Sequence, residues 1–318
     1  MKKIVLIISV ISSLIIATIF YTSNNTAKLT YSFYHWKNSF NQVNIKEKLY
    51  IKVLEVTYSN KIEPIRTSFK TKPNDDFVPV VYITNEAMKN LSFKEISKSI
   101  QNTLKALNNK NYKYNELQID CDWSDLTRSN YFNLLKDLKN KLAIKLSATI
   151  RLHQVKYAKR TGIPPVDYGL LMYYNMSTIT KLETKNSILD NNIARKYHYN
   201  FDIYPLKLKL ALPLYSQAVW FRKNEALEII QGAKKEDFSS NFIEISPNIY
   251  KCLESDYFKG RYVYKNDIFR FEDSKEEDIK TALNDFFKIA SNRFNEIVFY
   301  TFSYKDKYNL TNLLKGYK

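Results

Sequence analysis

The stretch that decides the fold is Leu117-Gln118-Ile119-Asp120-Cys121-Asp122-Trp123-Ser124-Asp125. If it is a strand, the apolar side chains at 117, 119 and 121 lie on one face, and Gln118, Asp120 and Asp122 lie on the other. The apolar face then packs under a helix, and the acids point inward near the C-terminal end of the strand, where active sites lie in barrels of alternating strands and helices. The alternative is a half-buried strand whose acids face water. Trp123 directly after the acids argues against that alternative.

Similar strand-like runs recur along the chain with helical patterns between them. The runs are Leu29–Trp36, Leu49–Val56, Phe77–Thr84, Glu116–Asp122, Lys145–His153, Tyr168–Asn175, Lys207–Tyr215 and Glu296–Phe302. Clear helical patterns cover Ser92–Leu107, Asn130–Leu142 and Lys275–Asn292. Eight strands that alternate with helices predict a single α/β barrel of the (β/α)8 TIM type over residues 28–318.

Local signals mark helix starts and two irregular stretches. Ser92 with Glu95, and Ser274 with Glu277, each have the spacing of a capping box and predict the starts of two helices. The stretch 57–76 shows little periodicity and contains two prolines. The stretch 225–231 begins with a helical pattern, and 238–271 follows it as an insertion rich in aromatic residues.

Composition narrows the class of protein. With 45% hydrophobic and 15% aromatic residues, the 318-residue chain is not disordered and can bury a large core. Only 5 glycines are present, and no glycine-rich phosphate loop is found. The net charge of +17 raises the possibility of nucleic-acid binding. The lysines are scattered among Asn, Ile and Tyr rather than clustered in a groove, so we predict no nucleic-acid partner.

The N-terminus predicts export. Residues 4–21 are almost uninterrupted apolar and follow Lys2 and Lys3. Such a run is either a signal peptide, with the best cleavage site near Ala27, or an uncleaved membrane anchor. The lysines should stay cytoplasmic, which sends the rest of the chain outward. We therefore predict a segment 1–27 that is a signal or a membrane anchor, and a periplasmic or cell-surface domain, most simply a monomer.

Cysteines and histidines give little evidence of metal or redox chemistry. Cys121 and Cys252 are the only cysteines, so one disulfide is possible in an oxidising compartment. The position of Cys121 on an apolar strand face favours a buried free thiol. A metal site would need His35 or His153 together with the two acids, and no metal-ligand spacing supports it. We predict neither a metal nor a cofactor.

Polar and aromatic residues gather at the ends of several predicted strands. The first strand ends at Trp36, and alternation along the fifth places Arg151 and His153 on the acid-bearing side. The sixth strand ends in Tyr174 and Asn175, and the seventh in Tyr215, with Trp220 close behind. Aromatic rings stack on the C–H faces of sugars while polar groups bind hydroxyls. The set therefore predicts a sugar-binding cleft.

These motifs resemble the chitinase-like superfamily of glycoside hydrolase barrels. That family ends its fourth strand with D-x-x-D-x-D-x-E and its sixth with M-x-Y-D, and it has a proline and an aromatic on the seventh. Asp120 and Asp122 match the two central acids, and Met172 and Tyr174 match the sixth strand, where Asn175 replaces the Asp. Pro213 and Tyr215 fit the seventh strand. The resemblance implies an α/β barrel that acts on a polysaccharide, with Asp122 and Asp120 as its catalytic carboxylates.

The departures from the family pattern bear on catalysis. Leu117 stands where the family has its first Asp, and Ser124 where it has the proton-donating Glu. A serine cannot protonate a glycosidic oxygen near neutral pH, so the substrate-assisted route of the family does not carry over intact. Asp122 matches the position that orients the acetamido group, and Asp125 lies one residue past the missing acid.

Two interpretations follow from this loss. The Cα atoms of Asp120 and Asp122 should lie about 6.6 Å apart at roughly 3.3 Å per residue, so the carboxyls can couple, one acting as acid and one staying ionised. A nearby Arg151 would lower both pKa values, which suits a nucleophile or an electrostatic stabiliser better than an acid. Alternatively, the barrel has lost hydrolysis and binds a glycan. The sequence leaves both open.

Overall fold

The structure is a computed structural model that describes residues 29–317. The predicted N-terminal signal or anchor lies outside this range. Within it, no helix is both long enough and apolar enough to span a membrane.

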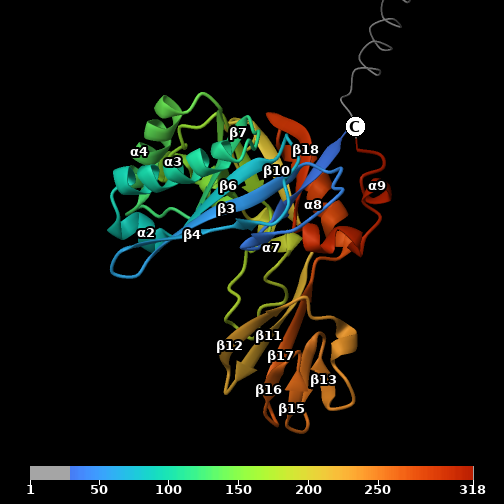
Figure 1. Cartoon of the computed structure of the whole chain (residues 1–318). Helices are drawn as coiled ribbons and strands as arrows, with labels where there is room; N and C mark the ends of the chain where they lie inside the picture. Colours follow the sequence, from blue (N-terminus) through green and yellow to red (C-terminus); the bar gives the residue numbers. More distant parts are fainter. Residues whose placement is uncertain (1–28, 318) are drawn as a thin grey trace, which may run out of the picture.

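A closed barrel of parallel strands forms the main body (Figure 1). Its sheet runs in the order β1-β18-β10-β9-β8-β7-β6-β3, and β1 also pairs with β3, which closes the ring. All eight predicted strands are confirmed. Their bounds are β1 (Thr30–His35), β3 (Leu49–Tyr58), β6 (Val78–Ile83), β7 (Glu116–Cys121), β8 (Lys145–Arg151), β9 (Tyr168–Met172), β10 (Leu208–Pro213) and β18 (Arg293–Tyr300).

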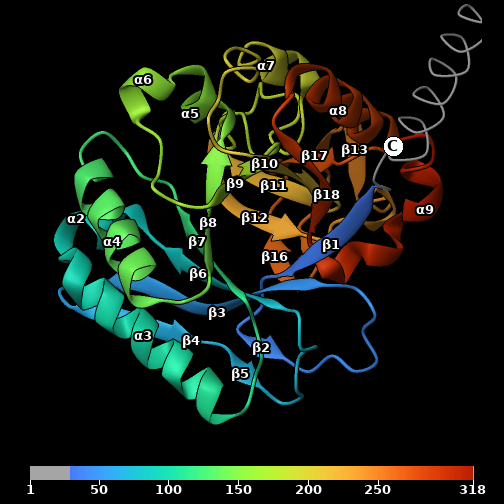
Figure 2. The same ribbon diagram turned by 90° about the horizontal axis from the view of Figure 1, so that it is seen from above.

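Helices lie around the outside of the strands, as the view from above shows (Figure 2). The longer ones are α3 (Phe93–Asn109), α4 (Arg128–Lys141) and α8 (Glu276–Ile289), where the sequence predicts them. The shorter ones are α2 (Asn85–Asn90), α5 (Leu152–Lys156), α6 (Ala158–Thr161), α7 (Asn191–Arg195) and α9 (Leu310–Leu313). Two short 3-10 segments span Lys235–Asp237 and Phe302–Lys307.

The predicted alternation along β7 is confirmed. Leu117, Ile119 and Cys121 are buried in the outer core, which also contains Leu134 and Leu138 of α4. Burying such side chains stabilises the packing of helix on strand by about 1.5–3 kcal/mol each. Gln118 and Asp120 face the barrel interior. Cys121 and Cys252 are both buried free thiols.

The centre of the barrel is filled with side chains. Near the N-terminal ends of the strands, the buried Lys209 ammonium lies 2.8 Å from a Glu296 carboxylate oxygen and donates to the Tyr50 hydroxyl at 2.7 Å. Around and above it lies an apolar cluster that includes Val78, Val80, Leu170, Ala211 and Val298. Because this interior is packed, ligands can approach only at the ends of the barrel.

One of the two predicted capping boxes is confirmed. Ser92 caps α3: its hydroxyl accepts from the Glu95 backbone N–H at 3.3 Å, and the Glu95 carboxylate accepts from the Ser92 N–H at 2.9 Å. The prediction for Ser274 is wrong. The N-cap of α8 is Lys275, and the Ser274 hydroxyl instead donates to the Tyr215 carbonyl at 2.9 Å.

Both irregular stretches contain strands. After β3, the chain turns into β4 (Ile62–Arg66), which pairs antiparallel to the end of β3. Two short strands, β2 (Ser39–Phe40) and β5 (Ser68–Phe69), then pair with each other.

The insertion after β10 forms a separate antiparallel sheet, which projects from one end of the barrel (Figure 1). Its strands are β11 (Ser216–Arg222), β12 (Glu225–Gln231), β13 (Phe242–Ser246), β14 (Ile249–Cys252) and β17 (Ile268–Asp273), with a hairpin of β15 (Asp256–Phe258) and β16 (Arg261–Val263) beside them. The helical pattern over 225–231 was misleading, because this segment pairs with β11 as strand β12. Pairing between strands outweighs local periodicity here.

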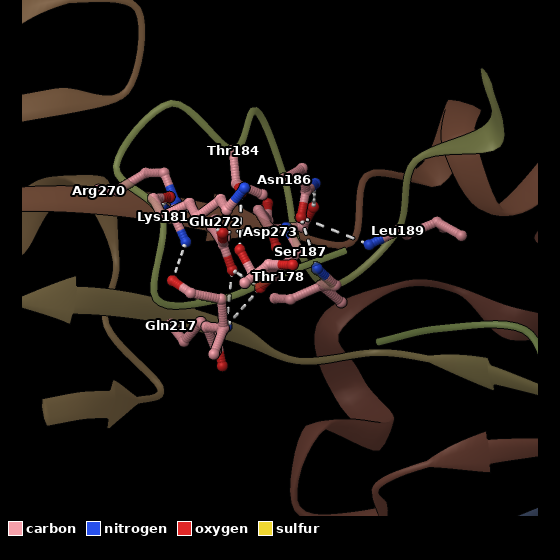
Figure 3. Close-up of polar contacts among 12 residues, drawn as sticks. Thr178, Lys181, Thr184, Asn186, Ser187, Leu189, Gln217, Arg270, Glu272 and Asp273 are labelled. Carbon is pink, nitrogen blue, oxygen red and sulfur yellow. Dashed lines mark hydrogen bonds and ion pairs between the residues drawn. The ribbon is translucent and has the colours of Figure 1, made fainter. Parts of the chain in front are cut away.

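Buried polar contacts tie the loop after β9 to the roots of this sheet (Figure 3). The Glu272 carboxylate accepts from the Ser187 hydroxyl and the Gln217 amide, both at 2.6 Å, and from Arg270 at 2.8 Å. Arg270 also donates to the Ile179 carbonyl at 2.7 Å. These contacts therefore hold the loop against β11 and β17, the two strands of the insertion that connect to the barrel.

Candidate functional site

Asp120 lies inside the barrel at the C-terminal end of β7. Its side chain accepts a hydrogen bond from the Thr149 hydroxyl at 2.6 Å. The pKa of Asp120 is raised to about 6, mainly by burial and also by the negative charge of Asp122, while the Thr149 hydrogen bond and the Arg151 charge oppose the rise. Asp120 is 8% exposed. Asp120 therefore keeps its proton up to a pH of about 6, well above the range in which an ordinary Asp ionises.

Asp122 follows the last residue of β7 and is far more open. Its side chain is 45% exposed and forms an ion pair with Arg151, the last residue of β8. Neighbouring parallel strands end side by side, which brings these two residues together although 29 positions separate them. The mouth therefore holds a buried acid directly behind an exposed carboxylate.

Aromatic rings from the ends of four strands, β1, β9, β10 and β18, lie at the same end of the barrel. Tyr174 stacks on Tyr300 with ring centroids 5.5 Å apart, and Tyr215 meets Tyr300 edge-on at 5.6 Å. The Tyr215 hydroxyl donates to the Asn175 side-chain oxygen at 2.7 Å. Trp36, which is half-buried, lies 6.0 Å from Tyr300. The structure thus brings together the predicted residues Trp36, Tyr174, Asn175 and Tyr215.

The sequence prediction misplaced two residues. Trp220 belongs to β11, where it is buried in the core of the insertion and stacks on Phe269 at 5.9 Å, so it does not line the barrel mouth. His153 does not continue the alternation of the fifth strand, because β8 ends at Arg151 and α5 begins at Leu152. Burial lowers the pKa of His153, and the nearby positive charge of Arg151 lowers it further. His153 thus lies on α5 and is still close to the ion pair of Asp122 with Arg151.

Several residues at the mouth escaped the sequence reasoning. Tyr82 is the register partner of Asp120 across β6 and β7. Lys52 lies 5.5 Å from the Trp36 ring and 2.7 Å from the Glu55 carboxylate. The available signal was the alternation along the second and third strands, which places these side chains on the same inner face as the acids.

The segment after Asp122 turns away from the mouth. Trp123 is buried and stacks on Tyr131 of α4 at 5.1 Å. The Ser124 N–H donates to the Thr127 hydroxyl at 2.9 Å, which fixes the start of the turn into α4. Asp125 is exposed and lies 3.9 Å from Arg160. Residues 29–317 contain no group of three or more His, Cys, Asp or Glu side chains suited to hold a metal ion.

Comparison with known proteins identifies the fold. No family model matches the sequence, and no curated protein is similar to it. Among solved structures, the chain is similar to the spore cortex-lytic enzyme SleL of Bacillus cereus, with a TM-score of 0.51 and 13% identity over 91% of this chain and 74% of that one. It is also similar to a chitinase from Chromobacterium violaceum, with a TM-score of 0.53 and 9% identity over 88% of this chain and 96% of that one.

The chain shares the barrel fold of these two proteins. The resemblance to chitinase-like barrels is therefore confirmed at the level of the fold. At 9–13% identity, the comparison carries no residue roles across, so the chemistry must be argued from the mouth of this barrel.

Proposed function

We propose that this protein is an extracytoplasmic carbohydrate-active barrel, a glycoside hydrolase that acts on a polysaccharide. The supporting observation is the arrangement of Asp120 and Asp122. Two carboxyls two residues apart, one in β7 and one directly after it, have different environments: Asp120 is buried with its pKa raised to about 6, and Asp122 is exposed beside Arg151. Neighbouring carboxyls in such different environments are typical of sites where one carboxyl holds a proton and the other stays ionised.

In this proposal Asp122 acts on the anomeric centre. Its carboxylate stabilises the positive charge that develops when the glycosidic bond breaks, or orients a substrate group that does so. Below about pH 6, Asp120 is protonated behind it and keeps negative charge from accumulating at the base of the site. Trp36, Asn175, Arg151 and His153 form the subsites for the sugar, over the buried rings of Tyr174 and Tyr215.

The alternative, a glycan-binding barrel without turnover, is supported by one observation. Ser124 occupies the family position of the proton donor, and its backbone is committed to the turn into α4 by the Thr127 hydrogen bond. A barrel with the aromatic rings of a cleft but without this acid could bind a glycan and release it unchanged.

One experiment separates the two functions. The exported protein and its Asp122→Asn variant are screened on a panel of polysaccharides for both binding and reducing-end release. If the barrel is a hydrolase, the wild type releases reducing ends and the variant loses this activity by orders of magnitude. If it is a binding module, both proteins bind the same glycan and neither releases reducing ends. Absence of any glycan binding or turnover would contradict both.

The location rests on the sequence alone. The apolar run at 4–21 behind Lys2 and Lys3 supports export, with the domain outside the cytoplasmic membrane. Cell fractionation, with intact-mass measurement of the exported form, tests this and shows whether the segment is cleaved near Ala27. A mature chain found in the cytosol would refute the proposal.

A further inference from the structure

The mouth contains a hydroxyl that the proposed chemistry has not yet used. Tyr82 lies near the C-terminal end of β6, and its register partner in β7 is Asp120. Partners in register point to the same face of a sheet, so Tyr82 shares the inner face with Asp120. Its ring lies 5.8 Å from that of Trp36, and its side chain is half-buried. Tyr82 is thus placed between an aromatic wall and the acids.

Among residues 29–317, the Tyr82 hydroxyl has no hydrogen-bond partner, unlike the hydroxyls of three other tyrosines inside the barrel. Tyr215 donates to Asn175, and Tyr50 accepts from Lys209. Tyr34 donates to Gln118. A half-exposed phenol without an internal partner is free to donate to a ligand in the mouth.

The surrounding charges keep this phenol protonated. Burial raises the pKa of Tyr82 to about 12, and the negative charges of Asp120, Asp122 and Glu55 contribute to the rise. All three carboxylates are therefore within electrostatic reach of the hydroxyl. At any pH near neutrality, Tyr82 presents an O–H donor where the neighbouring carboxylates present acceptors.

We propose that Tyr82 is the proton donor of this barrel, in place of the acid that Ser124 cannot supply. This inference rests on the proposed hydrolase function. As the bond between the anomeric carbon and the glycosidic oxygen breaks, its electron pair goes to the departing oxygen, which takes the proton of the Tyr82 hydroxyl. The water that then adds its oxygen to the anomeric carbon returns a proton to the phenolate. One water is consumed, and two hydroxyl groups result.

The chemistry suits a phenol at this position. Even with its pKa raised to about 12, the Tyr82 phenol is a stronger acid than an aliphatic alcohol, so proton transfer to a departing alkoxide is favourable. A leaving group whose conjugate acid is strong, such as 2,4-dinitrophenolate, departs as a stable anion and needs no proton. The contribution of Tyr82 should therefore depend on the leaving group, which a merely structural role would not.

The test measures kcat/KM of the full chain on matched pairs of substrates. The unactivated members are the tetrasaccharides of chitin, cellulose and xylan, and the activated members are the 2,4-dinitrophenyl glycosides of the corresponding disaccharides. Tyr82→Phe removes only the hydroxyl. Tyr257→Phe, on the exposed hairpin of the insertion, is the matched control. A third variant combines Tyr82→Phe with Ser124→Glu.

We expect Tyr82→Phe to lower kcat/KM on the unactivated substrate by about 10²-fold or more, the lower range of general acid catalysis. On the activated partner the loss should stay within about threefold, and Tyr257→Phe should match the wild type on both. Added Ser124→Glu should restore part of the loss.

Equal losses on both substrates, or no loss on either, would overturn the role of Tyr82 while leaving the hydrolase function intact. A wild type that cleaves none of the six substrates would overturn the hydrolase function, and the role of Tyr82 with it.

Discussion

Replacing Asp120 by Asn should change how the stability of the protein depends on pH. The folded-state pKa of about 6, against an ordinary value of 3.8, is a shift of about two units. At about 1.4 kcal/mol per unit, the native fold loses about 3 kcal/mol from this group as the pH rises. The sign follows from the direction of the shift: below about pH 4 the carboxyl is protonated in both states, whereas above about pH 6 the folded protein must bury a charge.

Asn keeps the acceptor oxygen for the Thr149 hydroxyl and never ionises. Relative to wild type, Asp120→Asn should therefore gain about 3 kcal/mol in free energy of unfolding between pH 4 and pH 8. Urea denaturation followed by tryptophan fluorescence, at several pH values in this range, gives the difference directly. The matched control is Asp122→Asn, which removes the charge that helps to raise the Asp120 pKa and should shift the wild-type loss toward lower pH.

A stability difference between Asp120→Asn and wild type that stays constant from pH 4 to pH 8 would refute the reasoning. It would mean that Asp120 is solvated in the folded protein and that its pKa is ordinary. The assignment of Asp120 as the proton-holding member of the pair would then fail as well.

Three further predictions concern the rest of the site. Arg151→Gln removes a charge that lowers the folded-state pKa of Asp120, so in urea titrations the fall in stability should continue to a higher pH and become larger; a fall that ends at a lower pH would contradict the ion-pair geometry. Trp220→Ala should lower the free energy of unfolding by about 3–5 kcal/mol, measured by thermal unfolding, because it empties part of the insertion core. Below the unfolding transition the variant should bind glycan as tightly as the wild type. Weaker glycan binding by the folded variant would show that Trp220 does belong to the sugar-binding site. Because Ser124 replaces the acid of acetamido-assisted hydrolysis, chitin oligomers should be cleaved inefficiently, and Ser124→Glu should raise the rate; strong wild-type chitinase activity would disprove this.

The fold was accessible from the sequence because its signals are local. Alternation along a strand is set by backbone geometry, so 117–122 predicted which side chains face the helices and which face the interior. The same geometry, repeated over eight segments, predicted a barrel. Where two local signals competed, the prediction failed. The segment 225–231 has a helical pattern, but its backbone groups pair with β11.

The candidate site was accessible only in part. The residues that follow directly from strand ends, such as Asp120, Tyr174 and Tyr215, lie where alternation and the parallel arrangement of strands placed them. Tyr82 was missed because nothing in its own sequence neighbourhood marks it. Its importance comes from Asp120, which lies 38 positions away and is brought beside it by the pairing of β6 with β7.

The sequence by itself predicted the eight barrel strands, the three longer helices and the inner face of the fourth barrel strand. These depend on residue identity and on periods of two or 3.6 residues. Only the tertiary structure decided that Asp122 forms an ion pair with Arg151 and that Asp120 is buried and bonded to the Thr149 hydroxyl. It also placed Trp220 in the core of the insertion. Burial and charge pairing are properties of neighbours in space, and closing a sheet into a barrel makes neighbours of residues that the chain keeps far apart.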